Sequence, residues 1–221
     1  MRRVVNEVRR VGMNRYSSAI LCILLLLFAV PTVNAAITSH SCADDSDGAI
    51  IMTSPSWTDN GNKDYTLSMN CAQWGFPDDS AAPGHLAGDF QTDTELDPTV
   101  RILEDITNDT TFAWTDYHIT IGMTQSFSFL GLTAPAGWAA SIVGPAAGYI
   151  PNGGPMGYVA TINYVMGTGG SPIDIGGDDI FGFKVSFLGS TNFSTEQIPT
   201  PEPTTILLLG LGAMSVIRRR R

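Results

Sequence analysis

Basic residues are scarce in the main part of this 221-residue chain. Between residues 36 and 200 only Lys63, Arg101 and Lys184 are basic, whereas 19 side chains are acidic, a formal charge of −16. A surface of that charge repels phosphate backbones, so nucleic acid is excluded as a partner. The remaining basic residues are arginines at the two ends of the chain, five before residue 36 and four at the C-terminus.

The sequence also lacks the common catalytic and metal-binding motifs. His40, His85 and His118 are far apart and form neither a zinc-protease motif nor a Cys/His zinc spacing. Nucleophile-elbow and phosphate-loop motifs are absent. Residues 36–200 hold 16 aspartates but only three glutamates, and no pair stands out as the two carboxylates of a glycosidase. These absences argue against an enzyme and predict no catalytic residue, cofactor or metal.

One acidic stretch, Asp44-Asp-Ser-Asp-Gly48, invites comparison with a calcium loop. If Gly48 took the sixth position of an EF-hand loop, Ala43 would be first and Ser54 twelfth, so the ligand pattern fails. A calcium site of another kind stays open there, and also at residues 174–179. Because aspartates next to Gly and Ser are typical of solvated turns, turns are the preferred interpretation.

Cysteines are few. Cys22 lies in the N-terminal apolar run, which leaves Cys42 and Cys71 in the main part of the chain. Two thiols in an exported chain favour a disulfide, which would close a loop of about 30 residues. We therefore expect a bond between Cys42 and Cys71, with two separate thiols as the alternative.

No segment carries an apolar stripe of helical period, whereas several alternate apolar and polar residues, as strands with one buried face do. The clearest runs begin at Tyr65, Tyr117, Tyr158 and Phe181, the last of them expected to lead into the C-terminal tail; shorter candidates are 49–53, 99–107, 126–130 and 138–143. About eight strands separated by turn residues predict an all-β fold for residues 36–198, an antiparallel β-sandwich of Ig-like or jelly-roll kind, with a barrel as the alternative. The Gly-, Pro- and Ala-rich segment 144–157 is expected to be a long loop.

Aromatic residues near turn signals are candidates for contact with sugars. Trp57, Trp74, Trp138 and Tyr149 are of this kind, whereas Trp114 falls on a patterned strand and is expected in the core. Packing inside the sandwich is the competing interpretation for all of these aromatic residues.

The N-terminus has the three parts of a secretory signal peptide. Arginines precede an apolar run over residues 19–30, and Val33-Asn34-Ala35 supplies small residues before a cleavage point. We predict a signal peptide over residues 1–35, cut after Ala35, with a cut after Ala36 as the near alternative.

The C-terminus carries a short apolar run with a proline-rich triplet before it and arginines after it. Residues 204–217 contain no charge, follow Pro201-Glu202-Pro203, and are stopped by Arg218, Arg219, Arg220 and Arg221. A helix of that length spans only about 21 Å, yet arginines can snorkel and the bilayer can thin to accommodate it. Because arginines favour the cytoplasmic side, we predict a short transmembrane helix with its C-terminus in the cytoplasm.

This order of elements at residues 199–221 resembles the PEP-CTERM sorting signal of bacteria. The resemblance implies that an exosortase, a membrane-embedded enzyme, recognises the tail and cuts near the triplet. It further implies a transient stay in the membrane, followed by transfer to the cell surface or release, and an association with extracellular polysaccharide and biofilm. Prolines also favour an extended, accessible peptide over residues 200–203.

Three hypotheses about function follow. The first is a structural, non-enzymatic protein of the cell surface or extracellular matrix. The second is a polysaccharide-binding module with the same sorting. The third is a secreted hydrolase.

Overall fold

The structure is a computed structural model that describes residues 36–74, 83–94 and 97–201. These residues form twelve β-strands and no helix. The strands are β1 (Ile37–Asp44), β2 (Ile50–Met52), β3 (Ser56–Asp59), β4 (Asp64–Trp74), β5 (Gly84–Thr92), β6 (Thr99–Asp109), β7 (Trp114–Met123), β8 (Phe127–Thr133), β9 (Trp138–Tyr149), β10 (Met156–Met166), β11 (Asp178–Phe187) and β12 (Thr191–Pro201).

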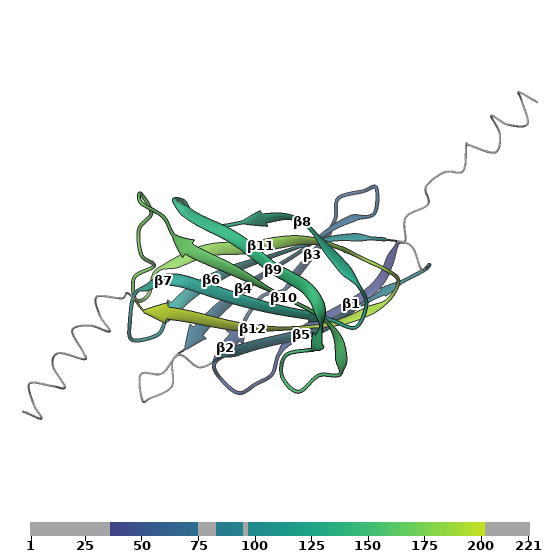
Figure 1. Ribbon diagram of the computed structural model, residues 1–221, viewed down its shortest axis with the longest axis horizontal. Coiled ribbons are helices and arrows are strands. Elements are labelled where there is room, and N and C mark those ends of the chain that lie inside the picture. Colours follow the sequence, from purple (N-terminus) through teal and green to yellow (C-terminus); the bar gives the residue numbers. More distant parts are fainter. Residues whose placement is uncertain (1–35, 75–82, 95–96, 202–221) are drawn as a thin grey trace, which may run out of the picture. The chain divides into compact units, whose positions relative to one another are not determined.

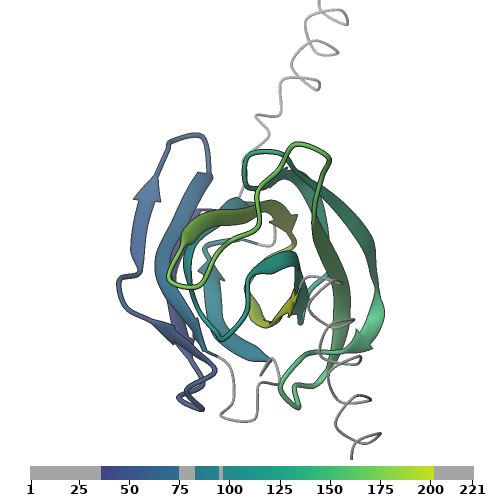
Figure 2. The same ribbon diagram turned by 90° about the vertical axis from the view of Figure 1, so that its left-hand side faces the viewer.

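The strands form two sheets that face each other (Figures 1 and 2). Sheet A has the order β1-β5-β12-β7-β10-β9, and sheet B has the order β2-β4-β6-β11-β8, with β3 also paired to β4. Every pair is antiparallel except β4 and β6, which run parallel. The predicted all-β sandwich is therefore confirmed.

The core lies between the sheets and is rich in aromatic rings. Trp114 and Tyr117 of β7 stack with centroids 5.3 Å apart, and Tyr117 stacks on Phe181 of β11 at 4.6 Å. The alternating runs bury the predicted faces of β4, β7 and β11, whereas Tyr158 at the start of β10 stays 40% exposed. Trp114 is fully buried, as predicted.

The last strand differs from the prediction. The run from Phe181 forms β11 in sheet B, and the chain then turns into a further strand, β12, in the middle of sheet A. The inward face of β12 includes Phe193, Thr195 and Gln197, all buried. Because two of these three side chains are polar, the strand shows no clear alternation in hydrophobicity, and the sequence did not reveal it.

Segment 144–157 is mostly strand, so the prediction of a long loop was wrong. β9 continues to Tyr149 and pairs with β10, which begins at Met156. The register shifts where Gly144 and Pro145 face Ala160, as a β-bulge requires. Since β9 is the edge strand of sheet A, the missing N–H of Pro145 disturbs no second neighbour.

The predicted signal peptide and the predicted transmembrane helix at residues 204–217 lie outside the described residues. Within residues 36–74, 83–94 and 97–201, no helix is long and apolar enough to cross a bilayer.

Candidate functional site

The sorting triplet begins where the sandwich ends. β12 pairs with β5 only as far as Gln197, but its pairing with β7 continues to Pro201, which lies opposite Trp114. Thr200 Oγ1 donates to the carbonyl oxygen of Asp116 at 3.4 Å. The chain is therefore held in the sheet up to the first residue of the Pro-Glu-Pro triplet.

Prolines fit this part of β12 because, among the described residues, it has a strand neighbour on one side only. A proline inside a central strand removes a ladder hydrogen bond, whereas an edge position tolerates it. Pro199 and Pro201 both lie beyond Gln197, where the β5 neighbour has ended. The sequence therefore permits a strand to run into the triplet.

At the other end, the first described residue is also fixed to the fold. The backbone N–H of Ala36 donates to Asp93 Oδ1 at 2.7 Å, and the N–H of Asp93 donates back to the Ala36 carbonyl oxygen at 3.0 Å. β1 begins at the next residue, Ile37. Ordered pairing thus starts immediately after the predicted cleavage point at Ala35.

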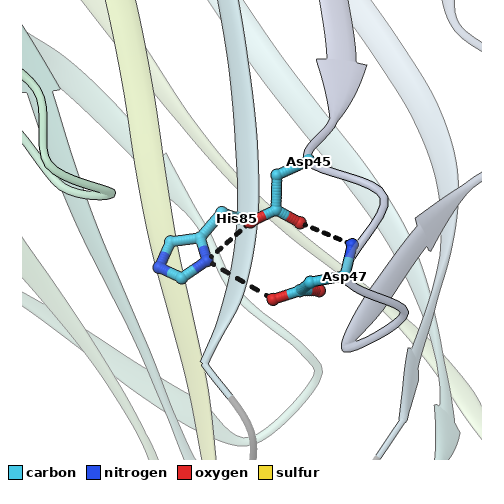
Figure 3. Close-up of side chains that lie close together, drawn as sticks. All are labelled: Asp45, Asp47 and His85. Atoms are coloured by element: carbon cyan, nitrogen blue, oxygen red, sulfur yellow. Dashed lines mark hydrogen bonds and ion pairs between the residues drawn. The ribbon is translucent and has the colours of Figure 1, made fainter.

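Asp45, Asp47 and His85 form the one group of three or more metal-ligating side chains that the described part of the chain contains (Figure 3). The aspartates lie in the turn between β1 and β2, and His85 lies at the start of β5. His85 Nδ1 is 3.0 Å from Asp45 Oδ2 and 3.9 Å from Asp47 Oδ2. One potential ligand atom from each residue lies within 4.8 Å of the others.

Each of these aspartates is held by one carboxylate oxygen and presents the other. Asp45 Oδ1 accepts the N–H of Asp47 at 3.2 Å, and Asp47 Oδ1 accepts the N–H of Ala49 at 2.8 Å. The Oδ2 atoms then point towards His85. Asn152, in the turn between β9 and β10, also donates to Asp45 Oδ2, at 3.3 Å. The turn thus orients both carboxylates towards His85 before any ligand binds.

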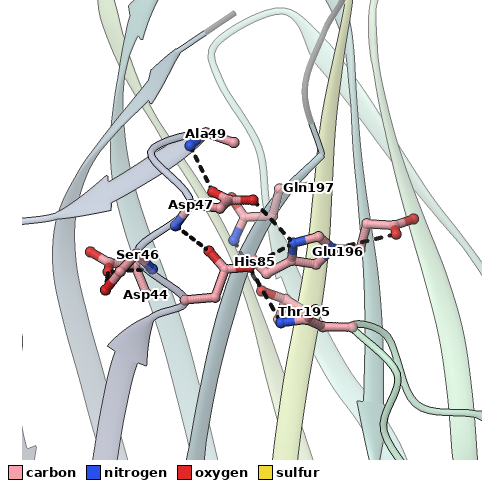
Figure 4. Close-up of polar contacts among 10 residues, drawn as sticks. Asp44, Ser46, Asp47, Ala49, His85, Thr195, Glu196 and Gln197 are labelled. Carbon is pink, nitrogen blue, oxygen red and sulfur yellow. Dashed lines mark hydrogen bonds and ion pairs between the residues drawn. The ribbon is translucent and has the colours of Figure 1, made fainter. Parts of the chain in front are cut away.

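The second ring nitrogen of His85 faces a third carboxylate (Figure 4). Glu196 lies directly opposite His85 in the pairing of β5 with β12, and its Oε2 is 3.6 Å from His85 Nε2. The His85 side chain is only 12% exposed. Sequence reasoning missed His85 and Glu196 because neither β5 nor β12 was recognised, and because 38 residues separate Asp47 from His85.

Of the two stretches considered for calcium, only residues 44–48 contribute to a group of potential metal ligands. Asp44 is used by the turn itself, because its Oδ1 accepts the N–H of Ser46 and its Oδ2 accepts the N–H of Met52. Asp45 and Asp47 of the same stretch join the cluster with His85. At residues 174–179, the described chain assembles no comparable group of three ligands.

Another carboxylate lies inside the core. Glu104 of β6 is 1% exposed, and neither of its carboxylate oxygens has a hydrogen-bond partner among the described residues. Burial raises the pKa of Glu104 to about 8, an effect that the Gln197 side chain partly offsets although it is outside proper hydrogen-bond geometry. The protonated form of Glu104 is therefore favoured at neutral pH, which no pattern in the sequence indicates.

The expected disulfide is absent, and both Cys42 and Cys71 are free thiols in the structure. Cys42 is on β1 of sheet A and Cys71 on β4 of sheet B. The bond would have to cross from one sheet to the other, and the two sulfur atoms are not at the distance that a disulfide requires. Burial, and next the Glu104 carboxylate, raises the pKa of Cys42 to about 12.

The three candidate tryptophans occupy different environments. Trp138 is 9% exposed, and its Nε1 donates to the Ser171 carbonyl oxygen at 2.9 Å, so it belongs to the core and offers no face to a sugar. Trp57 is half-buried and stacks on His40, with centroids 4.1 Å apart. Trp74, at the end of β4, is 44% exposed. Of these three, Trp74 presents the most open surface.

Comparison with known protein families finds a match in the tail. No curated protein is significantly similar to the chain. Residues 199–221 match the family described as the PEP-CTERM protein-sorting motif, a signal that directs export to the cell surface through exosortase, a membrane enzyme. The match begins at Pro199, inside β12, and includes the triplet and the arginines. This chain is therefore an exported protein whose β-sandwich ends in a PEP-CTERM protein-sorting motif.

Proposed function

We propose that the sandwich itself, residues 36–201, is the mature protein and serves as a structural, non-enzymatic component of the cell surface or extracellular matrix. The observation that carries this proposal is the position of the two predicted cuts. Ala36, the first described residue, is already bonded to Asp93, and Pro201, where the triplet begins, is the last residue of β12. Removal of both ends would leave the two sheets whole.

The strand pairing at the C-terminal end limits which peptide bonds the exosortase can cut. Pro199, Thr200 and Pro201 are paired with β7, so a protease that needs an extended, unpaired peptide would have to open the sheet to cut before them. A cut after Pro201 would leave every described pair between β12 and β7 intact. We therefore place the exosortase cut at or beyond the Pro201–Glu202 bond, after a transient stay of residues 204–217 in the membrane.

A non-enzymatic role agrees with the position of Glu104, the carboxyl group whose raised pKa would best suit a general acid. A general acid has to come within hydrogen-bonding distance of its substrate. Glu104 is enclosed between the sheets and 1% exposed, so it cannot reach a polysaccharide.

The test is mass spectrometry of the terminal peptides of the protein from membrane and extracellular fractions of its host. The proposal expects an extracellular form that starts at Ala36, ends between Pro201 and Pro203, and lacks the arginine tail. An extracellular form that retains Arg221 would make the tail a permanent anchor. A form that ends before Pro201 would contradict the proposed place of the cut.

A second candidate function, polysaccharide binding, is favoured by exposed tyrosines at the end of the β9–β10 hairpin. Tyr149 is 77% exposed and Tyr158 is 40% exposed. Because Tyr149 pairs with Met156 and Ala147 with Tyr158, the two rings are diagonal neighbours on one face. Glycan arrays would show binding that is lost in Tyr149→Ala or Trp74→Ala, whereas Trp57→Phe should leave it unchanged.

A further inference from the structure

We propose that Asp45, Asp47 and His85 bind one divalent transition-metal ion of the Zn²⁺ class, with Glu196 holding the imidazole from behind. This proposal does not depend on the role proposed for the sandwich. It rests on three observations. Three metal-ligating side chains from two separated segments meet, and the His85 ring lies between carboxylates. In addition, each aspartate already binds a backbone N–H with one of its two oxygens.

The distances suit a single small ion after modest adjustment. Ligands of tetrahedral zinc lie about 2.0–2.2 Å from the metal, and hence about 3.4 Å from one another. The separations of His85 Nδ1 from Asp45 Oδ2 and Asp47 Oδ2, 3.0 and 3.9 Å, fall on either side of that value. The Asp47 side chain is 41% exposed, so it is free to make the larger part of the movement.

The His85 ring itself points to a cation. With the Nε2–H directed at Glu196, Nδ1 carries a lone pair, and that lone pair faces two carboxylate oxygens. Nδ1 is buried and forms no hydrogen bond of proper geometry, even though Asp45 Oδ2 is only 3.0 Å away. In the tautomer that carries its proton on Nε2, a metal ion between Nδ1 and the carboxylates would turn three acceptors into three ligands.

Glu196 then acts as the outer partner that metal-bound histidines usually have. A carboxylate that accepts the far N–H fixes the tautomer and orientation of the ring and makes its free nitrogen a better ligand. Glu196 is opposite His85 in the sheet register, so the backbone of β12 sets this arrangement. Glu196 is a positioning residue and not a ligand, because its oxygen is on the other side of the ring.

The donor set selects against calcium and magnesium. Calcium takes six to eight oxygen ligands, often from bidentate carboxylates, and magnesium also prefers oxygen. Here Asp45 and Asp47 each use one oxygen on a backbone N–H, so each has a single oxygen to give, and the third ligand is nitrogen. An imidazole with two monodentate carboxylates suits Zn²⁺ and neighbouring metals, with a fourth position for water.

A bound ion would join separate parts of sheet A. The aspartates come from the turn after β1, His85 from β5, and Glu196 from β12, the strand that runs into the sorting motif. Because the ligands assemble only in the folded state, the ion stabilises that state in proportion to its affinity and concentration. The metal therefore also stabilises the pairing of β12 with its neighbour β5.

The experiment uses the full chain in detergent, stripped with a chelator, and titrates it with Zn²⁺ by calorimetry and by thermal unfolding. Asp47→Asn is the principal variant, since the amide oxygen can still accept the Ala49 N–H. Asp59→Asn is its matched control, because Asp59 Oδ1 likewise accepts a turn N–H, that of Gly61 at 2.8 Å, far from the cluster. His85→Ala and Glu196→Ala complete the set, and Ca²⁺ at the same concentration tests selectivity.

We expect one Zn²⁺ per chain and a higher Tm in its presence, with the control unchanged. Affinity should fall at least tenfold in Asp47→Asn, about tenfold in Glu196→Ala, and be lost in His85→Ala. In ¹⁵N spectra of the histidines, zinc should shift Nδ1 of His85 and leave its Nε2 protonated. Absence of zinc binding would overturn the proposal. So would equal binding by Asp47→Asn and Asp59→Asn, or displacement of zinc by equimolar Ca²⁺.

Discussion

Glu104 and the Asp45–Asp47 pair are carboxylates of one domain in opposite environments. Glu104 lies between the sheets without a hydrogen-bond partner, and burial raises its pKa to about 8. Asp45 and Asp47 lie at the surface, each with one oxygen on a backbone N–H and the other towards His85. The comparison shows that an acid enclosed without such donors has its pKa raised, whereas the two aspartates held by N–H donors of the turn can each offer an oxygen to a ligand.

The largest expected effect concerns the charge of Glu104. Its folded-state pKa, about 8, is above the usual value of 4.5, so the folded state binds more protons than the unfolded state between those two pH values. Stability should therefore fall as pH rises from 4.5, with the loss complete above pH 8, by roughly 5 kcal/mol in total. Urea unfolding of the full chain between pH 5 and pH 9 measures this slope.

Glu104→Gln is the variant that isolates the effect. It removes the ionisation and keeps the shape, so its stability should change little over the same pH range and exceed that of the wild type at pH 9. If the variant kept the pH dependence of the wild type, a group other than Glu104 would cause the loss of stability. Glu104 would then not differ from the two aspartates in the way stated above.

A buried polar side chain whose donors and acceptor are all hydrogen-bonded should stabilise the fold, unlike the unpaired Glu104. Asn108 donates to the carbonyl oxygens of Phe112 and Ile173, both at 2.9 Å, and accepts the N–H of Thr110. Asn108→Ala leaves these groups unpaired and should cost about 3 kcal/mol in the free energy of unfolding. Asn192→Ala, at an exposed position, is the control, with an expected change within about 0.5 kcal/mol. Equal losses in both variants would contradict this view of the core.

A smaller effect is expected for a carboxylate paired at the surface. Lys184 Nζ lies 2.9 Å from Asp64 Oδ2, with the two side chains 23% and 37% exposed. Lys184→Met should cost no more than about 1 kcal/mol at low salt, because exposed ion pairs contribute little. The difference from wild type should shrink in high salt, and a salt-independent loss would show that packing of the lysine stem matters more than its charge.

The smallest effect is expected at the cluster in the absence of metal. Asp47→Asn keeps the turn hydrogen bond to Ala49 and removes one of two neighbouring negative charges. Its free energy of unfolding in chelator should stay within about 0.5 kcal/mol of wild type. A larger loss in chelator would mean that Asp47 stabilises the fold through His85 directly, as an ion pair.

Prediction from the sequence succeeded where one face of a strand is apolar and failed where it is not. The runs from Tyr65, Tyr117 and Phe181 gave β4, β7 and β11 with the expected faces buried. β12 was missed because Thr195 and Gln197 are among its inward residues. The extent of β9 was also missed, because Gly144 and Pro145 resemble a loop until the bulge and the edge position are known.

The sequence by itself determined that the protein carries a sorting signal for export, and it determined the fold class. A sorting motif is read as a linear string, and alternation along one strand needs only local information. The tertiary structure alone decided which carboxylates meet a histidine, which one is buried, and that the sheet holds the chain up to the first residue of the triplet. These features depend on strand order and register, which bring His85 opposite Glu196 although more than a hundred residues separate them.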